Sequence, residues 1–354
     1  MTAPRNRDGI DPKSVIAAIE AAFDAAPMPA ANELTRPIDD PRSRAEADLF
    51  AAKLRGRHWS TLDRDFLRRN WAAWCYLTPA AQRHYVPALL RAALEAADLS
   101  REPLVHSIAY IFLTPSAYAV YFSGRDAHFD ALGALLNALQ REAIRKFLHL
   151  VMQAVPNHLY LAANALQRGW RDEGSLQTRA ADAYFERLHH FAPPPVTDRR
   201  AAAVIDSIRA AFDARPCPGD DQLCDSRQGD EPAEYALAFR KLDWRTLHPE
   251  FLLRNHAALS FFPDAAFRHF LPAFLIADLV DGSGTDSLFH LTYGLEGDEA
   301  PALGERQAGR LGAFTPAEHA AIVAYLQLRL AGDCVPPQLA SIRAALDRFW
   351  LRPR

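Results

Sequence analysis

The chain is 354 residues long, with 49% hydrophobic residues, 23% charged residues and a formal net charge of −3. This composition is ordinary for a soluble globular protein of about two domains, and it lacks the basic excess of a dedicated nucleic-acid binder. The most apolar stretch, residues 131–154, is interrupted by Asn137, Arg141 and Lys146, and residues 1–11 have no apolar signal-peptide core. We therefore expect neither a nucleic-acid partner nor a membrane span.

The four cysteines lie far apart or, for the closest pair, Cys217 and Cys224, outside any C-x-x-C spacing. A structural metal site needs soft ligands that converge at tight spacing. We expect reduced thiols in a cytoplasmic protein and assign no metal, no cofactor and no catalytic residue.

In chain order, residues 1–13 are expected to be a disordered tail and residues 14–190 a first helical domain, with Ser14 as the cap of its first helix. Helical spacing of apolar residues at Val15, Ile19 and Phe23 supports this start. Three consecutive prolines within residues 191–202 predict a stiff linker. Residues 203–352 are then expected to be a second helical domain.

The two predicted domains share a repeated stretch. Residues 59–94 align without a gap to residues 244–279, at a shift of 185, and 18 of the 36 positions are identical, of which six are Ala. No segment alternates with the period of two that is typical of a half-buried strand. The fold class predicted is all-α, with two homologous multi-helix domains from an internal duplication.

Prolines lie inside a helical pattern in both halves, at Pro87 and Pro272. Each removes a backbone donor and displaces the carbonyl four residues earlier, which belongs to Arg83 or Arg268. We expect a kinked helix whose freed carbonyl is paired by a side chain of the preceding helix. The candidate donors are Arg69, Asn70, Arg254 and Asn255.

The recurring residues have two interpretations. The functional one is a cleft in which His84 or His269 is a general base and an arginine holds an anion. The structural one, which we favour because no carboxylate or nucleophile recurs beside them, is that all of them shape the packing of helices. Trp59 and Trp244 are interpreted in the same way, as core anchors.

The loops differ in sequence between the two halves, although the predicted helices are similar. Residues 219–231 carry five acids against a single Arg227, whereas the corresponding loop of the first half mixes acids and arginines. This segment is either a solvated loop or a docking surface for a basic partner. The candidate partner-binding residues are Asp220, Asp221, Asp225, Asp230 and Glu231.

The second half resembles a family of small bacterial domains of unknown function over residues 204–292. The matching pieces are Ala211-Phe212, Pro216-x-Pro218-Gly219-Asp220-Asp221, Trp244-x-x-Leu247, Phe251-Leu252, Ala258-Leu259-x-Phe261-Phe262, Ala266-Phe267-Arg268 and Leu271-Pro272-Ala273-Phe274-Leu275. The first half departs from this pattern, with Ala30-Ala31-Asn32 in place of Gly-Asp-Asp and Gln82 before Arg83. The resemblance implies a helical bacterial cytoplasmic domain and supplies no activity.

The leading functional hypothesis is a non-enzymatic bacterial protein-binding module, and specifically an immunity protein that neutralises a basic toxin domain. Diverging polar loops on a rigid scaffold are where partner specificity usually resides. The first alternative is a hydrolase or transferase that acts on a small anionic substrate through His269, Arg268 and Arg254. The second is a purely structural or assembly domain.

Overall fold

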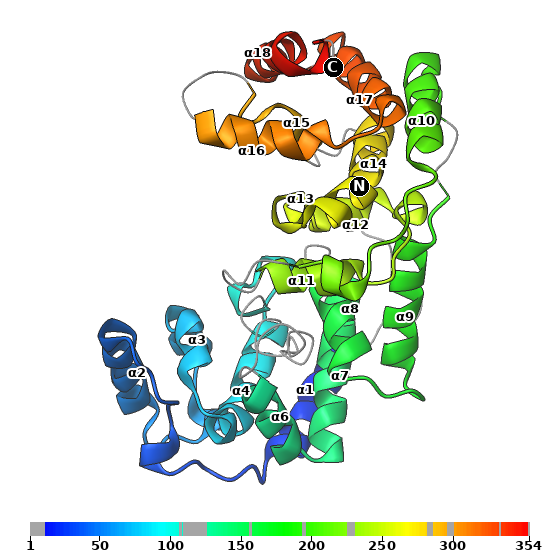
Figure 1. Cartoon of the computed structure of the whole chain (residues 1–354). Helices are drawn as coiled ribbons and strands as arrows, with labels where there is room; N and C mark the ends of the chain where they lie inside the picture. The colour runs from blue at the N-terminus through cyan, green and yellow to red at the C-terminus, as the bar shows by residue number, and fades with distance from the viewer. Residues whose placement is uncertain are drawn as a thin grey trace. The chain divides into compact units, whose positions relative to one another are not determined.

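The computed structural model of the protein describes residues 11–105, 108, 126–155, 158–192, 196–224, 231–281, 286–295, 301–332 and 334–352. Over these residues the chain is helical, and its one extended pairing is an isolated bridge between Thr35 and Leu77 (Figure 1). The predicted all-α fold class is confirmed. Among the described helices, none combines the length and hydropathy needed to cross a membrane.

Contacts within the chain divide it into two compact units, Met1–Phe185 and Glu186–Arg354. The helices and short helical turns of the first unit, through the helix α9 that contains the division, are α1 (Pro12–Phe23), η1 (Ala31–Glu33), α2 (Pro41–Leu54), η2 (Trp59–Thr61), α3 (Arg64–Arg69), η3 (Trp71–Tyr76), α4 (Pro79–Leu94), η4 (Leu99–Arg101), α6 (Asp126–Leu135), α7 (Ala138–Ala154), α8 (Leu159–Arg168) and α9 (Leu176–His189).

The second unit continues with further helices after this division. They are α10 (Arg199–Phe212), η7 (Asp220–Gln222), α11 (Glu231–Phe239), η8 (Trp244–Thr246), α12 (Pro249–Arg254), α13 (Ala258–Phe261), α14 (Asp264–Asp281), α15 (Ser287–Thr292), α16 (Pro301–Gly312), α17 (Pro316–Leu330), α18 (Pro336–Ala345) and η9 (Leu346–Trp350).

Short polar residues followed by proline start many of these helices. The Asp40 carboxylate accepts a hydrogen bond from Ser43 N at 2.7 Å at the start of α2, and Thr78 caps α4 in the same way. Proline fits directly after such a cap because the first backbone N–H of a helix has no partner to lose. The first helix begins at Pro12 under an Asp11 cap, so the expected cap at Ser14 is wrong by three residues.

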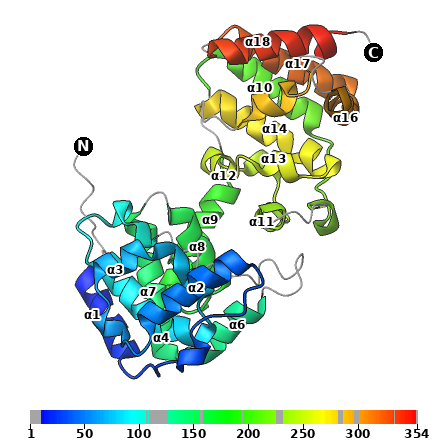
Figure 2. The same ribbon diagram turned by 90° about the vertical axis from the view of Figure 1, so that its left-hand side faces the viewer.

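The core of the first unit forms where α1 packs against both α4 and α7 (Figure 2). Helix α4 runs without interruption through Pro87 and is buried along most of its length. Its Tyr85 hydroxyl donates to the main-chain carbonyls of Leu54 and Arg57, at 3.0 and 3.1 Å. These hydrogen bonds from a buried tyrosine of α4 therefore hold the C-terminal end of α2 against α4.

The core of the second unit forms where α10 packs against both α14 and α17. Phe239 is at the centre of an aromatic cluster, with ring centroids of Phe251, Phe262 and Phe270 at 4.9–5.0 Å. These pairs adopt the tilted and edge-to-face arrangements that aromatic rings prefer. The second unit thus has an apolar core of its own.

Candidate functional site

The two recurring histidines are core residues. His84 is 1% exposed and His269 is 2% exposed, and each ring packs edge-on against the aromatic residue that follows it at 4.7 Å. The Nδ1 atom of His84 lies 3.1 Å from the Ala26 carbonyl. Burial lowers the pKa of both imidazoles, so at neutral pH both are uncharged.

The negative charge of Asp243 acts on His269, although its carboxylate is engaged with Arg245. Asp243 opposes the burial-driven lowering of the His269 pKa, and its Oδ1 atom accepts hydrogen bonds from the Arg245 main chain and guanidinium, both at 3.0 Å. Arg268 donates to the carbonyls of Asp264 and Ala313, at 3.1 and 3.3 Å. Arg268 is therefore engaged within its own unit, whereas the two ring nitrogens of His269 are buried without a hydrogen-bond partner among the described residues.

For the two asparagines, the predicted pairing with the carbonyls freed by the prolines is wrong. The Asn70 amide donates instead to the Phe66 carbonyl at 2.7 Å, and the Asn255 amide donates to the Phe251 carbonyl at 2.8 Å. Each asparagine ends a short helix, where the last carbonyls lack intrahelical donors. Asparagine recurs at these positions because its amide supplies that donor.

The remaining recurring residues lie at different depths. Pro87 and Pro272 are buried, Arg69 is exposed, and Arg83 and Arg254 are half-buried. Trp59 and Trp244 are 3% and 2% exposed, and the Trp59 indole donates to the Phe23 carbonyl at 3.3 Å. A guanidinium covers each indole ring, from Arg91 in the first unit and Arg245 in the second.

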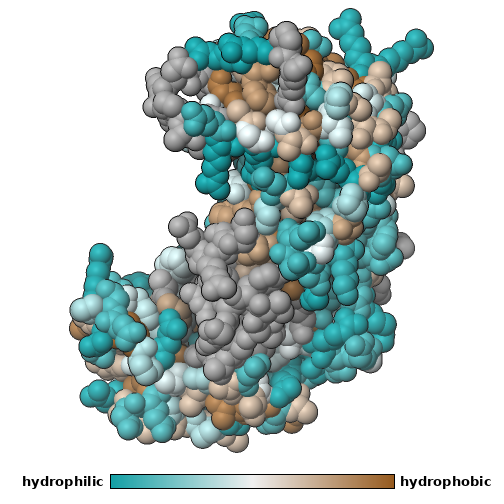
Figure 3. Space-filling model, viewed as in Figure 1, coloured by the Kyte–Doolittle hydropathy of each residue, from teal (hydrophilic) through white to brown (hydrophobic). Residues whose placement is uncertain are grey.

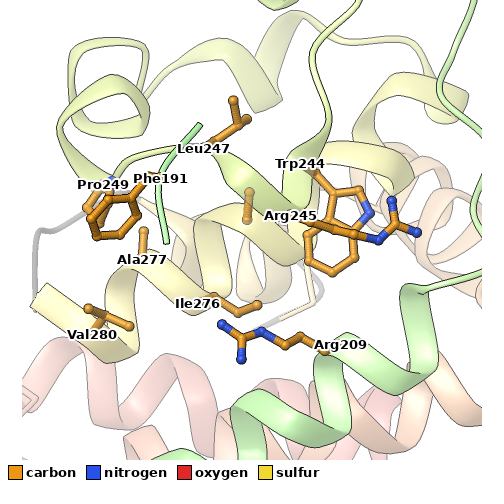
Figure 4. A pocket seen from close by; sticks show the side chains of 10 residues that line it. Phe191, Arg209, Trp244, Arg245, Leu247, Pro249, Ile276, Ala277 and Val280 are labelled. Carbon is orange, nitrogen blue, oxygen red and sulfur yellow. The ribbon is translucent and has the colours of Figure 1, made fainter. Parts of the chain in front are cut away.

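A small apolar pocket lies over α14 in the second unit (Figure 4). Its lining includes Ala273, Ile276, Ala277 and Val280, which share one face of α14, and Arg209 of α10. The enclosed space is about 20 Å³, room for about one water molecule, whereas small-molecule sites usually hold a few hundred Å³. His269 is not among the residues that line it. A pocket of this volume is a packing defect and is too small to be a substrate site.

The acidic segment is described at its two ends, while Asp225 and Asp230 lie outside the described residues. Asp220 forms an ion pair with Arg240, with Nε and Oδ2 2.7 Å apart, and this hydrogen bond lowers the pKa of its carboxyl. Asp221 and Glu231 are exposed. The cation that pairs with Asp220 is 20 residues away along the chain, so the local composition of the loop did not reveal it.

A buried polar network that the sequence did not predict joins α14, α15 and α17. The Tyr325 hydroxyl donates to Asp278 Oδ2 at 2.7 Å and lies 3.3 Å from Ser287 Oγ. The Nε atom of Arg329 lies 3.3 Å from Asp278 Oδ2 as well. Burial, and next to it the Asp278 charge, raise the pKa of Tyr325 well above its ordinary value, so the tyrosine stays a neutral donor.

This network belongs to the second unit alone. By the shift of 185 residues, Asp278 aligns with Ala93, and in the helix pair α7 and α17 Tyr325 aligns with Phe147 and Arg329 with Val151. The signal was present in the sequence, because three apolar residues of one half become polar in the other. Only the structure shows that the three polar side chains meet.

Residues 200–353 match the model of a family of unknown function (DUF6714). The match covers most of the second unit and agrees with the predicted resemblance of this half to an uncharacterised family, which it extends beyond residue 292. It includes the Asp278–Tyr325 network and the described acids of the 219–231 segment. No curated protein and no solved structure matches the chain.

Proposed function

We propose that the chain is a non-catalytic protein-binding module built from a duplicated helical scaffold. Supporting the duplication, α1 packs on α4 and α7 as α10 packs on α14 and α17, and Asn70 and Asn255 end their helices with the same hydrogen bond. The partner that fits best is a basic protein, and the specific proposal is a toxin domain neutralised in the bacterial cytoplasm. Cys217 and Cys334 are free thiols, which suits that compartment.

The observation that carries this proposal is that the described start of the acidic segment is held in place by packing and hydrogen bonds while the carboxylate of Asp221 faces solvent. Pro218 and Leu223 are buried on either side, and Gln222 Oε1 accepts a hydrogen bond from Gly219 N at 3.1 Å. Asp221 makes no ion pair with the described residues and is exposed. Acids fixed in place on a rigid frame attract and orient a basic partner without a large ordering cost.

The glycine of this turn lies close to the side chain of Asp221. A Cβ atom built on Gly219 would lie 2.6 Å from the Asp221 carboxylate oxygen, so a larger residue here would make that carboxylate turn to another direction. The first unit has Ala30 at the corresponding turn, where Glu33 takes the capping role and Asn32 stands in place of the acid. The Gly-Asp-Asp sequence of the second unit therefore presents an acid in a position that the first unit does not offer.

The enzymatic alternative has less support. A hydrolase or transferase that uses His269, Arg268 and Arg254 needs the imidazole to reach a substrate, and His269 is 2% exposed. Arg268 already donates to two carbonyls of its own unit. A purely structural role, the remaining alternative, predicts that the chain associates with itself.

The test is to purify the tagged chain from its native cells, identify a co-purifying protein, and measure binding of the two purified proteins. We expect the double variant Asp221→Lys, Glu231→Lys to lower the association rate about tenfold at low salt, because steering depends on the charges. The matched control is Asp206→Lys, which reverses an exposed acid of α10.

Two further results decide between the hypotheses. If the partner is a toxin, its expression arrests growth of a test cell and co-expression of the chain restores growth. Equal association rates for the wild-type chain and the double variant would overturn the assignment of the surface. Capture of no partner, together with self-association of the purified chain, would favour the structural alternative.

A further inference from the structure

The first unit carries a surface around α3 that is rich in arginine, in contrast to the acidic segment of the second unit. Its centre is a shallow hollow, largely open to solvent, of about 420 Å³, which is lined by Asp65, Arg68, Arg69, Trp71 and Pro103. Trp71 is 48% exposed. Hydrophilic residues make up much of the described surface visible in Figure 3. Among the large hydrophobic side chains exposed in the described part of the chain, Trp71 is the tryptophan.

The local backbone explains why Trp71 faces out. Asn70 ends α3 with its hydrogen bond to the Phe66 carbonyl and also precedes the helical turn η3, so the chain changes direction at this residue. Trp74, three residues later, is 1% exposed and packs edge-on against Phe50 at 5.3 Å. The turn therefore buries one tryptophan and presents the other.

Cations outnumber their partners at this hollow. Arg64 and Arg68 both pair with Glu102, whose side chain is 2% exposed, so a single carboxylate is shared by two guanidinium groups. Arg69 is exposed and makes no hydrogen bond or ion pair with the described residues. Lys53 donates to the neutral Asn70 side chain at 3.0 Å. Asp65 also lines the hollow and offsets part of this positive charge, and the guanidinium of Arg69 remains available to a ligand.

Three residues at or beside the hollow are not part of the shared scaffold, whereas Arg69 aligns with Arg254. At the aligned positions of the second unit, Arg64, Arg68 and Trp71 are replaced by Pro249, Leu253 and His256. The helix is present in both units, as α3 and α12, so it forms without these side chains. A structural requirement of the fold therefore does not account for them.

We propose that this hollow binds an acidic peptide segment of a partner protein, with a carboxylate on Arg68 and Arg69 and an apolar side chain against Trp71. Arginine forks pair with carboxylates through parallel hydrogen bonds, and Trp and Arg are the residue types most enriched in binding hot spots. Single-stranded nucleic acid also stacks on aromatic residues and needs cations. It fits less well, because the hollow offers two arginines and one tryptophan, whereas a single strand is usually followed by a longer basic groove that contacts successive phosphates.

The test is a selection from a random peptide library displayed on phage, with the full-length chain as bait. We expect enrichment of peptides that contain Asp or Glu next to an apolar residue. Synthetic labelled versions should bind at least about tenfold more weakly to Arg69→Glu and to Trp71→Ala than to the wild-type chain, measured by fluorescence anisotropy. Both changed residues are exposed or half-exposed, so the fold should persist, as circular dichroism can verify.

The matched control is Arg42→Glu, which reverses a 90% exposed arginine side chain of the same unit and should leave peptide binding unchanged. The proposal is overturned if no peptide is enriched, if the enriched peptides lack acids, or if all three variants bind equally. It is also overturned if a labelled oligothymidylate binds at this site and displaces the peptides with higher affinity. None of these results depends on the acidic segment of the second unit, so the two proposals fail separately.

Discussion

Replacing Tyr325 by Phe should destabilise the second unit by about 2 kcal/mol, because the lost hydrogen bond is buried and its acceptor is charged. The hydroxyl is 2.7 Å from Asp278 Oδ2, and Tyr325 is fully buried. Without it, the Asp278 carboxylate, 6% exposed, keeps Arg329 at 3.3 Å as its partner in the network. For a unit of this size, the loss corresponds to a fall in Tm of about 4–8 °C.

The network also predicts that its parts are coupled. Asp278→Ala alone leaves the buried Tyr325 hydroxyl without its acceptor, whereas Asp278→Ala with Tyr325→Phe restores the residue types of Ala93 and Phe147. We expect the double variant to cost about 1–2 kcal/mol less than the sum of the single changes. The measurement is calorimetry, with hydrogen exchange of α14 and α17 to assign the change to the second unit.

A matched control is Tyr293→Phe, which removes a hydroxyl from a tyrosine that is 46% exposed. It should change stability by less than about 0.5 kcal/mol. The reasoning is refuted if Tyr325→Phe is no more destabilising than this control, or if the two network substitutions simply add.

Three other changes test single interactions. Asn255→Ala should cost about 1 kcal/mol by calorimetry, because the Phe251 carbonyl loses its amide donor. Burial raises the pKa of Glu318, but hydrogen bonds from Arg215 and Thr315 outweigh this effect, and the net pKa is lowered. The stability lost in Glu318→Gln, measured by urea titration, should therefore be greatest above pH 4.5 and vanish at lower pH. Burial lowers the pKa of His290 to about 4, so between pH 6.5 and 4 the unfolded chain binds more protons than the folded chain. Stability should therefore fall as the pH decreases through this window. His290→Gln should flatten this slope, and an unchanged slope would contradict the reasoning.

The helical architecture could be predicted from sequence because its signals are local. Apolar spacing, polar caps and proline starts act within a few residues, and they gave the all-α class. Even so, the expected cap at Ser14 was displaced to Asp11, because two polar residues near the same helix start compete for that role. Boundaries are set by such small energy differences.

The partners of polar side chains could not be predicted, because they depend on which helices meet. Asn70 was expected to serve a neighbouring helix, and it serves its own. The Asp278–Tyr325 contact joins residues 47 positions apart. The hollow at Trp71 was likewise invisible, since exposure of a tryptophan depends on how the chain turns after Asn70.

The central claim is that the recurring histidines are packing residues and that recognition belongs to the surface. Nuclear magnetic resonance titration of the His84 and His269 imidazoles, assigned with His84→Gln and His269→Gln variants, tests it most directly. The account predicts that both rings remain neutral as the pH falls through 6.5, and that neither shifts when an acidic peptide or the captured partner is added. Titration of either ring at or above its ordinary pKa, or a direct contact between either ring and a bound ligand, would contradict it.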